Sequence, residues 1–239
     1  MEHLPASAFY IDDHALLYAL AARAAEQRMG EPGRRAAEEA VVIYGRERGA
    51  RCALRCLADG QPLTMENYLL YGEWVDDRGW SKGGVEAFSP VYRTRTTTCG
   101  WCESWRRTDL LDYGKGYCTF IDKNLVFGFN PALELELGEL LSHGGGGCAF
   151  GWVGCAFADE EALRRHRARR AEQLPRLIRD FRYHCGHLYS ALRRSFVHNF
   201  GAERGFALLE EARQAYAAHF GKDKAAHIAR ASEQDFLTV

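Results

Sequence analysis

Apolar residues recur at helical spacing at both ends of this 239-residue chain, and this pattern limits the possible folds more than any other feature. A helix is predicted over residues 13–29, with apolar positions at Leu16, Leu17, Leu20 and Ala24. Gly30 ends this pattern, a second helix is predicted over 34–57, and helical spacing returns from Asp159 onward. The strands of any sheet must therefore come from the middle of the chain.

The middle has the residues and the alternation that strands need. Residues 85–98 are rich in β-branched and aromatic side chains, and residues 132–137 (ALELEL) alternate with a period of two. Four glycines at 144–147 are the predicted hairpin turn before a further strand that starts at Cys148. We predict an α+β protein that is rich in helices, with a small central antiparallel β-sheet flanked by N- and C-terminal helical hairpins.

The two helical ends resemble each other. LLYALAARAAEQRMG (16–30) is similar to HLYSALRRSFVHNFG (187–201), and further on Tyr44 matches Tyr216. Chance similarity between alanine- and arginine-rich helices is the alternative. A true repeat predicts two amphipathic hairpins that pack on each other, on the sheet or across a homodimer. Along the sequence we expect an N-terminal helical region (1–80), an α+β core (81–158) and a C-terminal helical region (159–239) that partly repeats 13–50.

Charge and hydropathy favour small or locally recognised partners. Lys and Arg number 31 against 32 Asp and Glu, so no overall field attracts the chain to nucleic acid or to a membrane. Eight arginines lie between Arg164 and Arg182; acidic residues among them favour a solvated helix face over a basic patch. With neither a signal peptide nor an apolar span in the sequence, we predict a cytoplasmic protein.

Eight cysteines remain to be explained, and in a reducing cytoplasm they are expected to be thiols. Cys99 and Cys102 form a CxxC at the predicted start of a helix, which a redox pair or a zinc hook would also show. The βαβ unit of a thioredoxin-like fold and a second metal-binding pair are both missing. Both interpretations are therefore disfavoured. A third interpretation takes Cys99 as one wall of a cysteine-lined pocket and Cys102 as a packing residue; Cys52, Cys56, Cys155 and Cys185 are taken as structural.

Cys118 and Asp122 are the most informative pair in the middle segment. They are four residues apart, so on a helix they share one face and can reach the same ligand. The alternatives are a packed thiol and a carboxylate paired with Lys115 or Lys123 on a solvated face. We expect Cys148, just after the glycine turn, to meet this pair at one cavity.

The order of these motifs resembles one known family. A Cys at a strand end (Cys99), YC-x3-D (117–122), FNP (129–131), the ALELEL strand and a glycine-rich turn before C-x-F (148–150) are similar to the L-2-amino-thiazoline-4-carboxylic acid hydrolase family. YGRERG (44–49) and DGQPLT (59–64) resemble its N-terminal helical part. The resemblance, from about Ala15 to Trp152, implies a hydrolase that opens a cyclic isothiourea to an N-carbamoyl amino acid. At 144–147, where relatives tend to have a polar residue, this chain has only glycine.

Ring opening at an amidine carbon needs a nucleophile, a proton carrier and a polar cradle for developing charge. A thiolate is the best side-chain nucleophile near neutral pH. The predicted catalytic residues are Cys118 as nucleophile, Asp122 as amidine ligand or proton carrier, Cys148 as second thiol or wall, and His143 as general base. The predicted substrate-binding residues are Cys99, Trp101 as a stacking surface, and Gly145 and Gly146 as donors of backbone N–H groups.

A non-enzymatic function is the alternative. Cys99, Cys118 and Cys148 are soft ligands that would suit a metal-thiolate or ligand-binding protein without turnover. We favour the hydrolase, which needs a small-molecule substrate and no organic cofactor.

Overall fold

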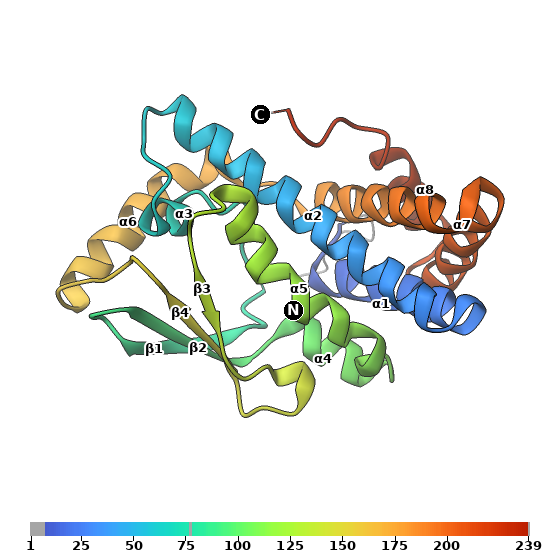
Figure 1. Cartoon of the computed structure of the whole chain (residues 1–239), viewed down its shortest axis with the longest axis horizontal. Helices are drawn as coiled ribbons and strands as arrows, with labels where there is room; N and C mark the ends of the chain where they lie inside the picture. The colour runs from blue at the N-terminus through green and yellow to red at the C-terminus, as the bar shows by residue number, and fades with distance from the viewer. Residues whose placement is uncertain (1–7, 77, 239) are drawn as a thin grey trace. The chain divides into compact units, whose positions relative to one another are not determined.

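The computed structural model describes residues 8–76 and 78–238 and is rich in helices, with one four-stranded antiparallel sheet (Figure 1). The predicted fold class is confirmed. In chain order the elements are α1 (Ile11–Met29), α2 (Glu31–Ala58), α3 (Met65–Leu70), β1 (Lys82–Ala87), β2 (Tyr92–Thr98), α4 (Gly100–Arg107), α5 (Leu111–Phe129), β3 (Leu135–Leu137), β4 (Cys148–Trp152), α6 (Glu160–Leu177), α7 (Phe181–Phe220) and α8 (Lys222–Ala231).

Two compact units make up the chain, and both α2 and α5 contribute to each of them. The first unit comprises residues 8–44, 100–119 and 180–235, and the second comprises 45–76, 78–99, 120–179 and 236–238. The division into 1–80, 81–158 and 159–239 is one along the sequence and stays a prediction.

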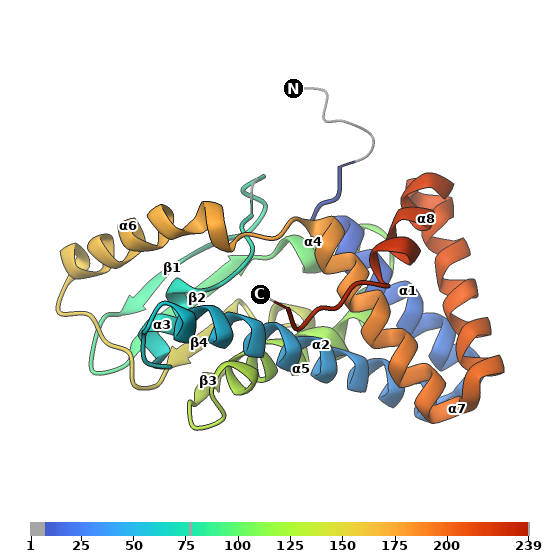
Figure 2. The same cartoon turned by 90° about the horizontal axis from the view of Figure 1, so that it is seen from above.

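The first unit is helical, and α1 is its centre. Helix α1 packs against α4 and along α7, beside which it lies in Figure 2. Almost every residue from Ile11 to Ala25 is buried, because contacts surround the helix instead of covering one face. This explains why its sequence has apolar and small residues on all sides.

Helix α7 is interrupted in its middle, at Gly201, where φ is 81°. Gly30, which separates α1 from α2, also has a positive φ, of 63°. Both glycines occupy a conformation that other residues rarely adopt, and each turns the chain into a helical hairpin. Gly30 and Gly201 are matched positions in the sequence repeat, so the two hairpins change direction at the same point.

The second unit contains the sheet, with strand order β1-β2-β4-β3. The run predicted over 85–98 covers the second half of β1 and all of β2, and the strand predicted over 132–137 is reduced to β3. The glycine run lies between β3 and β4 as predicted, in a connection that also contains a short 3₁₀ turn, Leu141–His143. Residues from α3, α5 and α6 cover one face of the sheet in a core of Met65, Tyr92, Val126, Leu135, Cys155, Phe157 and Leu163.

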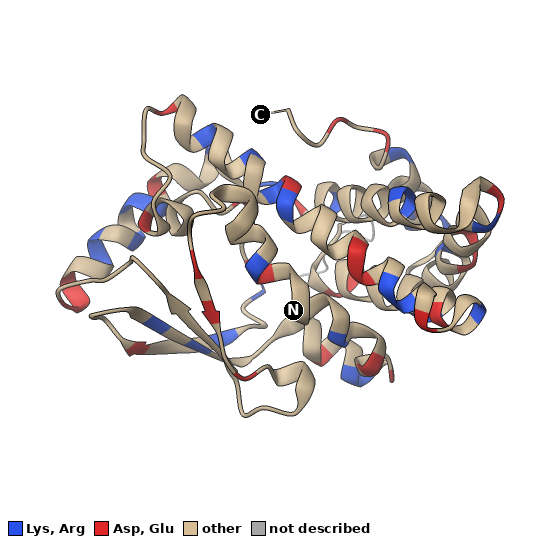
Figure 3. Ribbon diagram, in the orientation of Figure 1, with Lys and Arg blue, Asp and Glu red and all other residues tan. Residues whose placement is uncertain are grey.

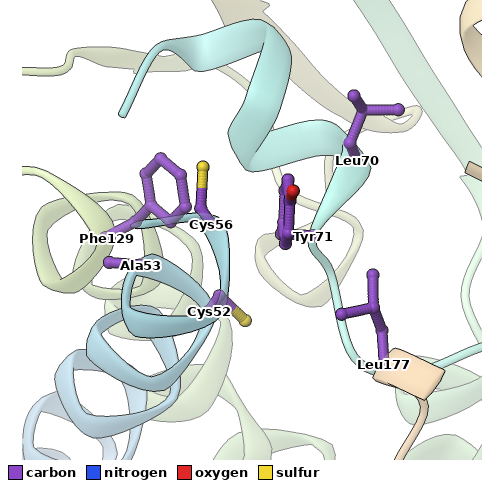
Figure 4. Packing of buried hydrophobic residues seen from close by; sticks show 7 residues of the cluster. All are labelled: Cys52, Ala53, Cys56, Leu70, Tyr71, Phe129 and Leu177. Carbon is purple, nitrogen blue, oxygen red and sulfur yellow. The ribbon is translucent and has the colours of Figure 1, made fainter. Parts of the chain in front are cut away.

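A second cluster of buried residues joins the end of α2 to α3 and α5 in the same unit (Figure 4). Cys52 and Cys56 contribute to it from α2 and meet Tyr71 and Phe129. Both thiols are buried, and so are those of Cys155 and Cys185. The packing role predicted for these four cysteines agrees with their burial.

Most of the arginine-rich segment lies in α6, where most of the arginines are exposed and acidic partners interrupt the basic surface. Arg164 and Arg165 pair with Glu161 one turn away, and Arg176 pairs with Asp59. Basic and acidic positions are both present along α6 in Figure 3. Among the described residues, no helix combines the length and the apolar character that crossing a membrane requires.

Gly49 gives a stability test of the contact between α2 and α5. A Cβ atom at Gly49 would lie 2.1 Å from the carbonyl oxygen of Leu125, so the two backbones would have to separate. We expect Gly49→Ala to destabilise the protein by about 1–3 kcal/mol, although alanine is the better helix former. Thermal unfolding measures this. Gly84→Ala, with no atom within 4 Å of the new methyl group, is the matched control; equal effects of the two changes would contradict the contact.

Candidate active site

The first candidate residue is Asp122, an acidic residue of the second unit with a raised pKa. It lies in α5 and is half-buried, and within the described residues its carboxyl group takes part in no hydrogen bond or ion pair. Burial raises the pKa of this carboxyl group to about 6, against an opposing effect of the Arg48 charge. The alternative pairing with Lys115 is wrong, because Lys115 binds Asp112. An unpaired acid that titrates near neutral pH is a typical component of an active site.

Cys148 of the same unit lies in the electrostatic field of Asp122, and Cys99 also acts on it. Cys148 begins β4, opposite Thr96 of β2, and Cys99 follows the end of β2. Burial raises the pKa of the Cys148 thiol, and the charges of Cys99 and Asp122 raise it further. The backbone N–H of Leu141 donates to the Cys148 sulfur (3.4 Å) and lowers the pKa in part. Cys148 is thus held as a neutral thiol, which suits a wall of the site better than a nucleophile.

Tyr68 brings an aromatic side chain and a phenol to the same region. Burial, followed by the charge of Asp122, raises the pKa of Tyr68, so the phenol is protonated at neutral pH. The ring of Tyr68 lies 5.6 Å from that of Phe129 and 6.0 Å from that of Trp152. Trp152 is itself held by a hydrogen bond from its indole N–H to Thr94 Oγ1 (3.1 Å). Flat rings held in this way suit contact with a small heterocycle.

A buried cluster of charges, which was not predicted from the sequence, acts on Asp122 and Tyr68 through Arg48. Arg48, Arg51 and Arg55 of α2 all donate to Glu73, at 3.2, 2.9 and 3.0 Å for their closest well-formed bonds to its two oxygens. Glu73 has no exposed surface. The spacing of the arginines, three and four residues, places them on one helix face and was the signal available in the sequence.

Cys118 lies in α5 one helical turn before Asp122, so the helix predicted for this pair is confirmed. Its side chain is half-buried, and Cys99 is the other half-buried cysteine; the remaining six are buried. Whether the sulfur atoms of Cys118 and Cys148 meet stays a prediction.

The loop that contains the glycine run and His143 differs from the predicted oxyanion-binding loop with a general base beside it. The N–H of Gly145 donates to the carbonyl of Leu140 (3.0 Å), and that of Gly144 donates to Leu141 (3.4 Å). Gly145 therefore has its amide engaged within the loop, whereas Gly146 is exposed with open space beside it. His143 is exposed, and its Nδ1 lies 3.0 Å from Ser142 Oγ. Of the predicted groups in this loop, Gly146 best keeps its proposed role.

Trp101 belongs to an aromatic cluster in the first unit. Its indole N–H donates to His14 Nδ1 (3.1 Å), so the proton of neutral His14 lies on Nε2, which donates to Tyr44 Oη (3.0 Å). The Tyr44 hydroxyl in turn faces His184 Nδ1 at 3.4 Å. Trp101 is half-buried and stacks on Tyr117. These bonds fix the orientation of its ring; its contact with substrate stays a prediction.

The alternative function needs a group of metal ligands. Within residues 8–76 and 78–238, no three His, Cys, Asp or Glu side chains gather in a group that would hold a metal ion. A metal bound by Cys99, Cys118 and Cys148 stays a prediction, which metal analysis of the purified protein would test.

The fold and this region define a helix-rich α+β protein in which a thiol, that of Cys148, lies near a carboxyl group of raised pKa. A family model described as L-2-amino-thiazoline-4-carboxylic acid hydrolase matches residues 11–152. The match covers more than half of the chain, and the chain belongs to this family. No curated protein and no solved structure shows a significant match to the chain.

Proposed function

We propose that this protein is a cysteine-dependent hydrolase that opens a small cyclic isothiourea or amidine, with a thiazoline carboxylic acid as the model substrate. The name of the family supports a hydrolase for such a ring. The observation that carries the proposal is Asp122, a half-buried carboxyl group with no bonded partner among the described residues and a pKa of about 6. It follows Cys118 by one turn of α5, so an acid–base group accompanies a thiol.

The first chemical step is attack by Cys118. The thiolate forms a bond to the amidine carbon of the protonated ring while the electron pair of the C=N bond moves to nitrogen. Collapse of this adduct breaks the bond between that carbon and the ring sulfur, which leaves as a thiolate. The product fragment is now held to Cys118 through an isothiourea carbon.

Water completes the reaction. Its oxygen bonds to the same carbon while one of its protons passes to the Asp122 carboxylate, and the bond from carbon to the Cys118 sulfur then breaks. The second proton of the water reaches the departed ring thiolate, which leaves a carbonyl group, an N-carbamoyl product and a free thiol. Asp122 returns its proton to solvent, which replaces the proton that the ring brought in. The sum is the addition of one water molecule.

Asp122 acts in this mechanism as a carboxylate base, so its removal or its protonation should lower kcat/KM. Asp122→Asn keeps the shape and removes the base, so we expect kcat/KM for the thiazoline acid to fall by about 10²–10⁴-fold. In the wild type, kcat/KM should decrease as the pH falls through about 6, because protonation then removes the base. Ring opening is followed by the appearance of the free thiol and by the product mass.

Stability separates this effect from unfolding. Because the pKa of Asp122 is higher in the fold than in the unfolded chain, its ionised form destabilises the fold, and this cost is fully present above about pH 6. Asp122→Asn should therefore raise Tm at pH 8 while activity falls. Asp112→Asn, at an exposed position of the same helix, is the matched control. Unchanged activity in Asp122→Asn would reject the proposed function of this site.

A further inference from the structure

Arg48 and Asp122 lie on two helices that approach each other closely in the second unit. A Cβ atom at Gly45 of α2 would lie 3.3 Å from the carbonyl of Ile121 in α5, and one at Gly49 would meet that of Leu125. Residues 45–49 of α2 thus lie beside residues 121–125 of α5. Arg48 and Asp122 both fall within this stretch.

The two opposite charges act on each other without forming an ion pair. Burial raises the pKa of Asp122, and the positive charge of Arg48 opposes this effect. Within the described chain, Asp122 nevertheless has no ion pair or hydrogen bond with Arg48 or any other residue. A guanidinium group and a carboxylate therefore lie in one region, and the carboxylate remains available to a ligand.

Glu73 explains why Arg48 does not move to Asp122. The Nε–H of Arg48 donates to Glu73 Oε1 (3.2 Å), and the Arg48 side chain is only 6% exposed. Arg51 and Arg55 bind the same carboxylate and fix its position. Movement of Arg48 toward Asp122 would break a buried charge-assisted bond, which is costly.

Tyr68 lies in the field of both charges. The charge of Asp122 raises its pKa, after the larger effect of burial, and that of Arg48 lowers it. Its ring neighbours those of Phe129 and Trp152. The phenol is a neutral hydrogen-bond donor at a place where a bound anion near Arg48 would benefit from one.

We propose that Arg48, assisted by the Tyr68 hydroxyl, binds the anionic group of the substrate while Asp122 binds its cationic amidine. This inference rests on the proposed function and makes Arg48 the residue that selects zwitterionic substrates. A thiazoline carboxylic acid with a protonated ring has both charges on one small frame. Its carboxylate complements the guanidinium group, and its amidine complements Asp122, so each charge of the site meets the opposite charge of the ligand.

Paired substrates test this in the unmodified protein. We expect kcat/KM for the thiazoline carboxylic acid to exceed that for its carboxamide by about 100-fold or more, because the amide removes the anion and keeps the ring. Calorimetric titration of the two compounds gives their Kd values independently of turnover. Ring opening of both at equal rates would overturn the role of Arg48 and leave the proposed function standing. Tighter binding of the acid without ring opening would support charge selection and reject the hydrolase.

Two variants locate the selection. Arg48→Met should bring the two substrates within about 5-fold of each other, because the charge that distinguishes them is gone. Tyr68→Phe leaves the ring packing intact and should raise KM for the acid, but not for the carboxamide, by about 5–10-fold. This variant still tests the proposal if Arg48→Met does not fold. Arg46→Met, at an exposed position of α2, is the control. Retention of the wild-type preference in Tyr68→Phe and in folded Arg48→Met would overturn the proposal.

Discussion

Cys118→Ser is expected to reduce ring opening of the thiazoline acid by about 10³-fold or more, because it removes the proposed nucleophile. A serine hydroxyl occupies nearly the same volume, but it is not ionised near neutral pH and is a much weaker nucleophile than a thiolate. The fold should persist, since the side chain is half-buried and its hydroxyl can meet solvent. Steady-state kinetics with detection of the released thiol gives the result, and circular dichroism confirms folding.

Alkylation distinguishes Cys118 from the other accessible thiol. Cys99 and Cys118 are half-buried, whereas the remaining six cysteines are buried. Iodoacetamide should therefore modify these two first, and substrate should protect Cys118, as peptide mass spectrometry would show. Cys99→Ser is the matched variant and should lose much less activity than Cys118→Ser. The reverse outcome, an active Cys118→Ser and an inactive Cys99→Ser, would move the nucleophile to Cys99.

Glu73→Gln is expected to cause the largest loss of stability. The glutamine keeps the shape of Glu73 but leaves three buried guanidinium groups without the carboxylate that binds them. Removal of one partner from a buried ion pair costs about 3–5 kcal/mol. For a chain of this size that corresponds to a decrease in Tm of roughly 6–20 °C. Differential scanning calorimetry at neutral pH measures it.

An exposed ion pair supplies the comparison. Glu66 pairs with Arg169 at 3.6 Å, and about half of each side chain is exposed. Glu66→Gln should change stability by no more than about 1 kcal/mol, because solvent already screens the pair. A Glu73→Gln variant as stable as Glu66→Gln would show that the buried arginines are satisfied without the carboxylate.

Local patterns predicted the helices and strands well. The helices at both ends follow from apolar spacing, and the shared helix of Cys118 and Asp122 follows from their separation of four residues. The glycine run correctly indicated the connection between β3 and β4, but not its form. A 3₁₀ turn and the bond from Gly145 to Leu140 shape that loop, and a run of four identical residues carries no signal for either.

The charges around the site depended on contacts that the sequence does not encode locally. Glu73 lies in a loop without periodic pattern, so nothing marked it as the partner of arginines 18 to 25 residues earlier. Lys115 was available in the sequence as a partner for Asp122, and only the structure shows that Asp112 binds it. The raised pKa of Asp122 likewise results from burial by distant segments. His143 was the general base predicted from the sequence; it is exposed, and we propose Asp122 as the base in its place.

The hydrogen bonds among Trp101, His14 and Tyr44 run in a single direction. The Trp101 indole can only donate, so neutral His14 accepts a hydrogen bond at Nδ1 and donates one from Nε2 to the Tyr44 oxygen. The Tyr44 hydroxyl then donates to His184 Nδ1. No member can reverse its polarity alone. The indole N–H of Trp101 thus sets the direction of all these hydrogen bonds. With an aromatic ring that lacks a donor at position 101, neither tautomer of His14 would be fixed by this contact.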